Sequence, residues 1–169
     1  MRAQAGSDPG AARRADPAPQ GDAPDGLVVF DGLCGFCSAG VRAVLRADRG
    51  GAIRFTPLQS PYGRALARRY GIDAEDPSTF LFFDRGRPLE QSEAAIALAR
   101  RLPRPWRWLS VAAVLPRRPR DAVYGFVARN RYRIAGRSEA CMVPSLGERA
   151  RFVEEVPSSP GSSSVKRPE

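Results

Sequence analysis

The sequence predicts an α/β domain, in which a central sheet is flanked by helices and followed by a helical C-terminal extension. Apolar runs typical of buried strands occur at 27–30, 52–55 and 79–83, and segments with helical spacing separate them. Two further helical stretches follow at 105–115 and 119–130. Strands that alternate with helices in this way are typical of a layered α/β fold.

The first strand and the first helix enclose a short turn. The apolar run at 27–30 ends at Asp31-Gly32, which is the pattern of a buried strand followed by a turn. Apolar residues at helical spacing then predict a helix that begins near Cys37. The residues that carry this spacing are Val41, Val44 and Leu45.

The second strand and the second helix follow directly. The run at 52–55 reads as a strand. Ser60 is a favourable N-cap and Pro61 suits the first helical position, so a helix is expected to begin there. Gly71 is expected to end this helix about ten residues later.

The run at 79–83 is rich in β-branched and aromatic residues, and it is the strongest strand signal in the chain. A turn at 84–87 and a short returning edge strand at 88–91 are expected after it. Ser92 is expected to cap the next helix. One face of that helix carries four apolar residues: Ala95, Leu98, Ala99 and Leu102.

We expect the two helical stretches of the extension to pack onto the core. In the stretch at 119–130, three residues are expected to face inward: Val123, Phe126 and Val127. Trp106 and Trp108 lie in the other stretch, whose apolar run is too short to span a bilayer. We expect both tryptophans to pack against the core, and the alternative is an amphipathic segment seated on a membrane face.

Both ends of the chain have compositions typical of disordered segments. Residues 1–26 contain four Pro and four Gly, and residues 157–169 are rich in Ser and Pro. The folded domain is therefore expected over 27–156. No secretory signal sequence is recognised after Met1, which favours a reducing cytoplasm as the compartment.

The composition excludes several kinds of active site. The chain has no histidine, so a Ser-His-Asp triad, a Cys-His protease and His-ligated zinc or haem are excluded. Three cysteines are too few for a disulfide-stapled secreted scaffold. The net charge of +9 suggests nucleic acid or a membrane surface as a partner, but abundant Arg, Ala, Gly and Pro are also what GC-rich coding produces.

Seven arginines crowd into a stretch of about twenty residues in the extension. We expect them to form a solvated helix face, and the alternative is a site for phosphates or an acidic protein. A non-catalytic basic binding module on the same scaffold is accordingly the alternative function. The seven are Arg117, Arg118, Arg120, Arg129, Arg131, Arg133 and Arg137.

A Cys-x-x-Cys pair, Cys34 and Cys37, lies between the first strand and the first helix. This spacing lets the two sulfurs reach disulfide distance, and the positive end of the helix favours a thiolate. In a cytosolic chain beside a strand-helix-strand pattern, the pair is typical of a thioredoxin-like redox site. The alternative is a Cys-based zinc site, for which Cys141 is the remaining thiol. The sequence predicts no cofactor.

Several segments resemble the DCC family of thiol-disulfide oxidoreductases. They are DGLCGFC at 31–37, RFTPLQS at 54–60, STFLFFD at 78–84, SEAAIAL at 92–98 and the closing segment at 124–144. The resemblance covers roughly 27–146. It implies a thioredoxin-like fold and protein-disulfide reductase activity, with a disulfide-containing protein or small molecule as substrate and an external thiol as electron donor.

The resemblance also implies roles for the cysteines. Cys34 would attack the substrate disulfide, and Cys37, one helical turn deeper, would resolve the mixed disulfide. Asp31 is expected either to accept the proton that Cys37 loses or only to bond nearby backbone N–H groups. Cys141 is expected to be an inert buried thiol. The alternative is an accessory thiol that forms a second disulfide with Cys34 or acts as a relay thiol.

Thr79 marks a departure from glutaredoxin-like layouts, which place a cis-proline before the third main strand, opposite the cysteine pair. We expect Thr79 to be an ordinary strand start. The alternative is a residue that presents its backbone to a bound peptide and brings its hydroxyl close to the sulfurs.

Overall fold

The computed structural model describes residues 23–73, 77, 79–138 and 140–155. Within them, four strands form one mixed sheet in the order β2-β1-β3-β4. Strand β2 runs parallel to β1, whereas β3 is antiparallel to both β1 and β4. The bounds are β1 (Leu27–Phe30), β2 (Arg54–Pro57), β3 (Leu81–Asp84) and β4 (Arg87–Glu90).

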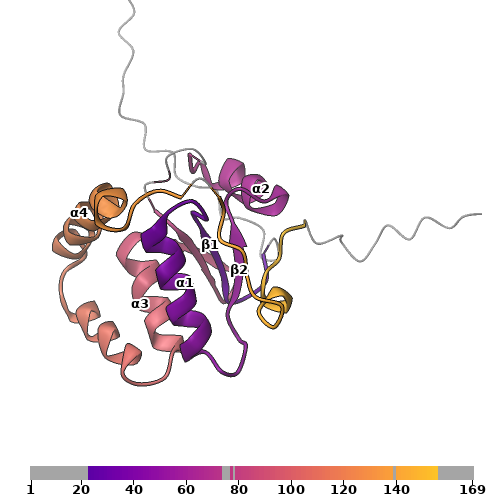
Figure 1. Cartoon of the computed structure of the whole chain (residues 1–169). Coiled ribbons are helices and arrows are strands. Elements are labelled where there is room, and N and C mark those ends of the chain that lie inside the picture. Colours follow the sequence, from indigo (N-terminus) through magenta and orange to yellow (C-terminus); the bar gives the residue numbers. More distant parts are fainter. Residues whose placement is uncertain (1–22, 74–76, 78, 139, 156–169) are drawn as a thin grey trace, which may run out of the picture.

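Helices cover both faces of this sheet (Figure 1). Helices α1 and α3 lie on one face and α2 lies on the other, while α4 stands beside α1 and α3. The bounds are α1 (Gly35–Ala47), α2 (Pro61–Tyr70), α3 (Gln91–Arg101), the 3₁₀ helix η1 (Trp106–Val114), α4 (Arg117–Ala135) and the 3₁₀ helix η2 (Arg149–Arg151). The predicted α/β thioredoxin-like class, with its helical extension, is confirmed.

The alternation of side chains along β1 divides the core in two. Val28 and Phe30 point toward α1 and α3, whereas Leu27 and Val29 point toward α2. All four side chains are buried. Strand β1 is therefore at the centre of the fold. The Asp31-Gly32 turn follows its carboxyl end and lies at the end of the sheet where the first helix begins.

Helix α2 has the predicted ends. The hydroxyl of Ser60 accepts a hydrogen bond from Gly63 N–H at 2.9 Å, Pro61 is the first helical residue, and Gly71 follows the helix with φ of 68°. The second strand begins at Arg54 rather than at Ala52. The N–H of Ile53 is bonded to the Asp48 carboxylate instead of to a neighbouring strand.

The start of α3 differs from the prediction. Glu90 occupies the N-cap position without a side-chain hydrogen bond, and the hydroxyl of Ser92 donates to Asp121 of α4 instead. The predicted apolar face is also incomplete, because Ala95 is exposed. The helix buries Ala94 and Ile96 as well as Ala99.

The extension packs less closely than its apolar residues predict. Trp108 is 70% exposed, so its predicted packing against the core is wrong, and Trp106 is 39% exposed. Val123 and Phe126 of α4 are exposed rather than inward-facing. The helix instead turns another face, which includes Arg131, toward α1 and α3. Val127, the third residue predicted to face inward, is partly buried on that side, so the inward direction was wrong for Val123 and Phe126 alone.

After α4, the chain returns over the loop that precedes α1. Three backbone hydrogen bonds fix this return: Gly35 N–H to Gly136 at 3.2 Å, Ser138 N–H to Leu33 at 2.8 Å, and Met142 N–H to Gly32 at 3.0 Å. We call residues 136–138 and 140–142 the covering segment. It covers the end of the sheet at which β1 ends (Figure 1).

The predicted disordered ends lie mostly outside the described residues, and the predicted domain limits of 27–156 stay a prediction. Residues 23–26 are an exception, because Asp25 pairs with Arg101 and Gly26 N–H donates to Phe83 at 2.8 Å. The ordered structure therefore begins before Leu27. Among the described residues, no helix has the length and apolar character needed to cross a membrane.

Candidate active site

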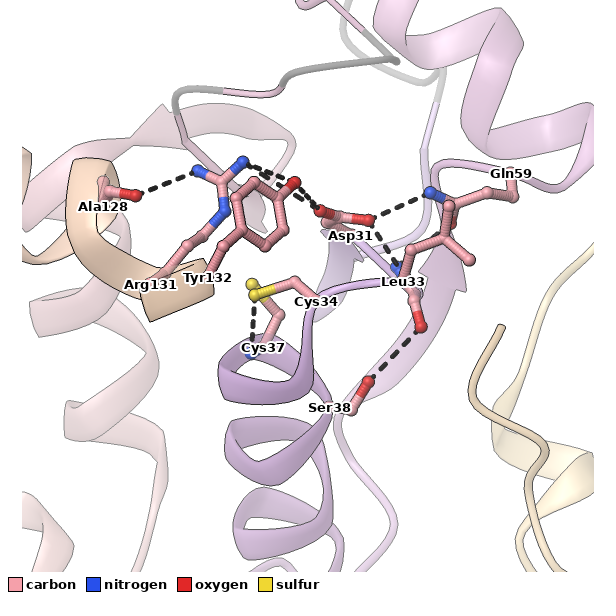
Figure 2. Close-up of polar contacts among 10 residues, drawn as sticks. Asp31, Leu33, Cys34, Cys37, Ser38, Gln59, Ala128, Arg131 and Tyr132 are labelled. Atoms are coloured by element: carbon pink, nitrogen blue, oxygen red, sulfur yellow. Dashed lines mark hydrogen bonds and ion pairs between the residues drawn. The ribbon is translucent and has the colours of Figure 1, made fainter. Parts of the chain in front are cut away.

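The turn after β1 places both thiols at the start of α1. Cys34 is the N-cap of that helix, and its sulfur accepts a hydrogen bond from Cys37 N–H at 3.2 Å. The two sulfurs lie side by side (Figure 2), and both are free thiols in the structure. A backbone N–H and the positive end of the helix thus both favour a thiolate at Cys34.

The burial of the two thiols is the reverse of what the sequence predicts. Cys34 has no exposed surface, whereas Cys37 is only partly buried and is therefore not the deeper of the two. The cause is the covering segment, in which Arg137 forms a β-bridge with Cys34. The chemical roles of the two cysteines do not follow from burial alone.

The surroundings of Cys37 keep its thiol protonated. Its pKa is raised far above the ordinary value, first by burial, then by its hydrogen bond with Cys34 and by the negative charges of Cys34 and Asp31. The nearby Arg131 cation opposes this effect. Cys37 is therefore a protonated thiol at neutral pH, and it can stabilise a thiolate at Cys34 by hydrogen bonding.

Asp31 is the centre of a buried hydrogen-bond network (Figure 2). Its side chain is 5% exposed. One oxygen accepts bonds from Leu33 N–H and from the Gln59 amide, both at 3.0 Å, and the other accepts the Tyr132 hydroxyl at 2.7 Å. The predicted bond to a nearby backbone N–H is confirmed, and the carboxylate additionally joins β1, the loop after β2, and α4.

Arg131 brings a positive charge to the same place. Its side chain is 7% exposed, its guanidinium donates to the Tyr132 hydroxyl at 2.9 Å, and it lies 4.0 Å from the Asp31 carboxylate. The prediction that Arg131 belongs to a solvated face is therefore wrong. Of the other six arginines, five are exposed and Arg120 is partly buried.

The local interactions keep Arg131 charged and Tyr132 protonated. Burial opposes the charge of Arg131, but its hydrogen bond to Tyr132 and its attraction to Tyr132, Cys37 and Cys34 raise its pKa. The pKa of Tyr132 is raised by burial, which the bond from Arg131 opposes, and by the bond to Asp31 and its charge. A permanent cation thus lies beside the thiol pair.

The sequence contains a weak signal for Arg131. Tyr124, Ala128 and Arg131 follow the spacing i, i+4, i+7, so they share one helix face. That face is the one turned toward α1 and α3. Seven arginines in one stretch concealed the signal, because nothing local distinguishes the buried guanidinium from the exposed ones.

Cys141 lies against the Asp31-Gly32 turn. Its sulfur packs directly on Gly32, where a Cβ atom would approach it to 2.2 Å, and it points toward Gln59 Oε1 at 3.9 Å. The pKa of Cys141 is raised, mainly by burial. A protonated, partly buried thiol is what the predicted inert role requires, and that role stays a prediction.

Thr79 precedes β3 rather than starting it. Its hydroxyl accepts a hydrogen bond from Gln91 N–H at 2.9 Å and lies 3.2 Å from the Tyr124 hydroxyl. The side chain therefore connects the start of α3 to α4. This arrangement differs from the ordinary strand start that the sequence predicts.

The zinc alternative finds no set of ligands in the described part of the chain. There, no three His, Cys, Asp or Glu side chains gather closely enough to hold a metal ion. Beside Cys34 and Cys37, the carboxylate of Asp31 bonds to Tyr132, Gln59 and Leu33 N–H.

Comparisons with known proteins agree with this site. A family model described as DCC1-like thiol-disulfide oxidoreductase matches residues 28–137. The chain belongs to this family, and the match supports a thiol-disulfide redox role in general.

Two curated proteins are similar over most of the chain. Bacillus subtilis (strain 168) YuxK, described as an uncharacterized protein, is 36% identical over 130 residues, which are 77% of this chain and 95% of YuxK. The Arabidopsis thaliana DCC family protein At1g52590, described as chloroplastic, is 35% identical over 116 residues, or 68% of this chain and 67% of that protein. No solved structure matches.

Proposed function

We propose that this protein is a protein-disulfide reductase that works by dithiol/disulfide exchange at Cys34 and Cys37. The observation that carries the proposal is the environment of the Cys34 sulfur. It accepts the Cys37 N–H at the start of α1, beside a buried guanidinium that remains charged. A helix N-terminus and a cation both stabilise a thiolate, which is the nucleophile in disulfide exchange.

In the first step, the Cys34 thiolate attacks one sulfur of the substrate disulfide. A bond forms between Cys34 and that sulfur, the substrate S–S bond breaks, and the leaving thiolate takes a proton from water. Because Cys34 is fully buried, the attack requires a shift of Cys37 or of the covering segment.

In the second step, Cys37 loses its proton and attacks Cys34. The Cys34–Cys37 disulfide forms and the second substrate thiol leaves, so two electrons have passed to the substrate. An external thiol donor then reduces the protein disulfide. Burial and the negative charge at Cys34 both raise the pKa of Cys37, and formation of the mixed disulfide removes the second of these causes.

Asp31 is proposed to accept the Cys37 proton, in addition to fixing the turn through its hydrogen bonds. An Asp31→Asn variant retains much of the hydrogen-bonding capacity but loses the charge. If Asp31 accepts the proton, the second step slows and its pH dependence changes. An unchanged pH dependence of substrate reduction would leave Asp31 with the structural role alone.

The central experiment is a thiol-trapping titration across a graded glutathione or dithiothreitol redox series, read by intact mass. A reversible two-electron step is expected in the wild type and should disappear in Cys34→Ser. If the pair stays reduced at every potential, the reductase proposal fails. If the two-electron step is observed, its midpoint potential shows whether a reducing compartment such as the cytoplasm favours the reductase direction.

A further inference from the structure

An apolar cavity adjoins the thiol pair on the α1–α3 side of the sheet. Its volume is about 270 Å³, and residues of β1, α1, α3, η1 and α4 line it. Its inner wall is formed by buried side chains that include Val28, Val41 and Ala99. Protein interiors are normally packed without such gaps, so this space requires an explanation.

The cavity opens to solvent and has a polar part of its lining. Phe36 and Leu109 line it and are 44% and 61% exposed, which places them at the mouth. Cys37, Asp31 and Arg131 supply the polar groups of the lining. The two thiols differ here, because Cys37 lines the cavity and Cys34 does not.

This arrangement matches one class of ligand. Apolar walls favour an alkyl or aromatic group, since an apolar cavity stays dry and takes up apolar molecules. Cys37 and Arg131 bring a thiol and a guanidinium to the same lining, where the sulfur of the ligand would lie. A cavity of roughly 150 Å³ accommodates benzene, so 270 Å³ corresponds to a group of about ten carbons.

We propose that this cavity binds the apolar group of the substrate disulfide, an alkyl or aromatic substituent carried on the sulfur that Cys34 attacks. That the bound group belongs to a substrate disulfide rests on the proposed reductase function. That the cavity binds an apolar group does not rest on it. In the mixed disulfide, the sulfur bonded to Cys34 carries its substituent into the cavity. Cys37 then attacks Cys34, the mixed disulfide breaks, and the apolar thiol leaves with the electron pair and takes up a proton.

Mixed disulfides of 2-mercaptoethanol with n-alkanethiols from methyl to octyl test this proposal. The reacting sulfurs remain chemically similar along the series, while the buried area grows. Burial of one methylene favours binding enough to raise kcat/KM about fourfold. We expect such a rise along the series until the cavity is filled, and a flat series would overturn the proposal.

A matched pair of variants locates the effect. Ala95 lies on α3, lines the cavity and is exposed, so Ala95→Phe places a ring at the mouth. This variant should abolish most of the dependence on chain length. Ala122→Phe adds the same ring to an exposed position of α4 outside the cavity and should preserve the dependence. Equal behaviour of the two variants would contradict the assignment.

A binding measurement separates the cavity from the redox chemistry. S-octyl-2-thioethanol, an unreactive thioether, is titrated calorimetrically into the Cys34→Ser/Cys37→Ser protein. Saturable binding that Ala95→Phe weakens at least tenfold supports the cavity even if the wild type fails to reduce disulfides. Absence of binding would overturn the cavity proposal even if the redox titration succeeds.

Discussion

Two arginines, the buried Arg131 and the partly buried Arg151, each join the late part of the chain to an early aspartate, but they do so differently. Arg151 contacts Asp48 closely, with 2.5 Å between its Nη2 and the carboxylate, and it also donates to the carbonyl oxygens of Asp48 and Ile53. Arg131 lies 4.0 Å from Asp31. The first contact fixes the turn before β2, whereas the second lies beside the thiols.

The difference follows from the partners of each aspartate. Asp48 accepts Ile53 N–H and Arg151, so its charge is matched directly by the guanidinium. Asp31 accepts Tyr132, Gln59 and Leu33 N–H instead. The charge of Arg131 thus acts on the sulfurs as well as on the carboxylate. The role of such an ion pair therefore depends on the hydrogen-bond partners of its carboxylate. Where the guanidinium itself bonds to the carboxylate, the pair stabilises the fold; where other groups bond to the carboxylate, the cation also acts on its other neighbours.

Replacement of Arg151 should have the largest effect on stability. Arg151→Met leaves a buried carboxylate without its cation, which costs about 3 kcal/mol of unfolding free energy. Urea denaturation followed by circular dichroism measures the loss. The midpoint of the thiol titration should stay unchanged in the folded variant, and a shifted midpoint would show that the two arginines are not distinct in role.

Replacement of Arg131 should act on the thiols. A cation stabilises the reactive thiolate, so Arg131→Met should make Cys34 less reactive. Alkylation by iodoacetamide near neutral pH should slow about tenfold, which corresponds to about 1.4 kcal/mol. Rates measured across a pH series test this.

Two further variants make the Arg131 result specific. Arg131→Lys retains the cation and should recover part of the alkylation rate. Arg129→Met removes an exposed arginine from the same helix and should change the rate by less than about twofold. If both methionine variants slow equally, the effect comes from net charge rather than from position.

The raised pKa of Cys37 predicts how stability changes in base. In the unfolded chain the thiol ionises near its ordinary value of 9.0, whereas in the folded protein it stays protonated. The unfolded state therefore loses the proton first, and stability falls as pH rises above about 9. The Cys37 contribution at about pH 10 is a loss of about 1.4 kcal/mol. It should be absent in Cys37→Ala and retained in Arg151→Met, as measured by denaturation of the reduced proteins.

Replacement of Cys141 should have the smallest effect. Cys141→Ser is expected to change disulfide reduction by less than about twofold, because the thiol is protonated and its replacement is nearly isosteric. Turnover with a fixed thiol donor measures this. A larger loss of turnover would favour the relay role and would show that the covering segment contributes to the reaction.

The parts of the fold that could be predicted depend on local interactions. Ser60, Pro61 and Gly71 act within one helix, so their neighbours in sequence are sufficient to define its ends. The Cys34 and Cys37 pair is equally local, because its spacing and the helix start create the thiolate site. A continuous apolar run likewise defined β1.

The parts that could not be predicted depend on contacts between distant residues. Ser92 has the composition of an N-cap, but its hydroxyl bonds to Asp121, 29 residues away. The burial of Arg131 depends on which face α4 turns toward α1. Val123 and Phe126 are apolar yet exposed, so hydrophobicity alone did not identify that face.

The separation of the site along the chain has a consequence for protein synthesis. Asp31 and the two thiols leave the ribosome about a hundred residues before Arg131 and Tyr132, which complete their environment. Domains begin to fold while translation continues. The growing chain therefore carries the cysteine pair first, without its partners, and it acquires the buried cation and the cover over Cys34 only about a hundred residues later.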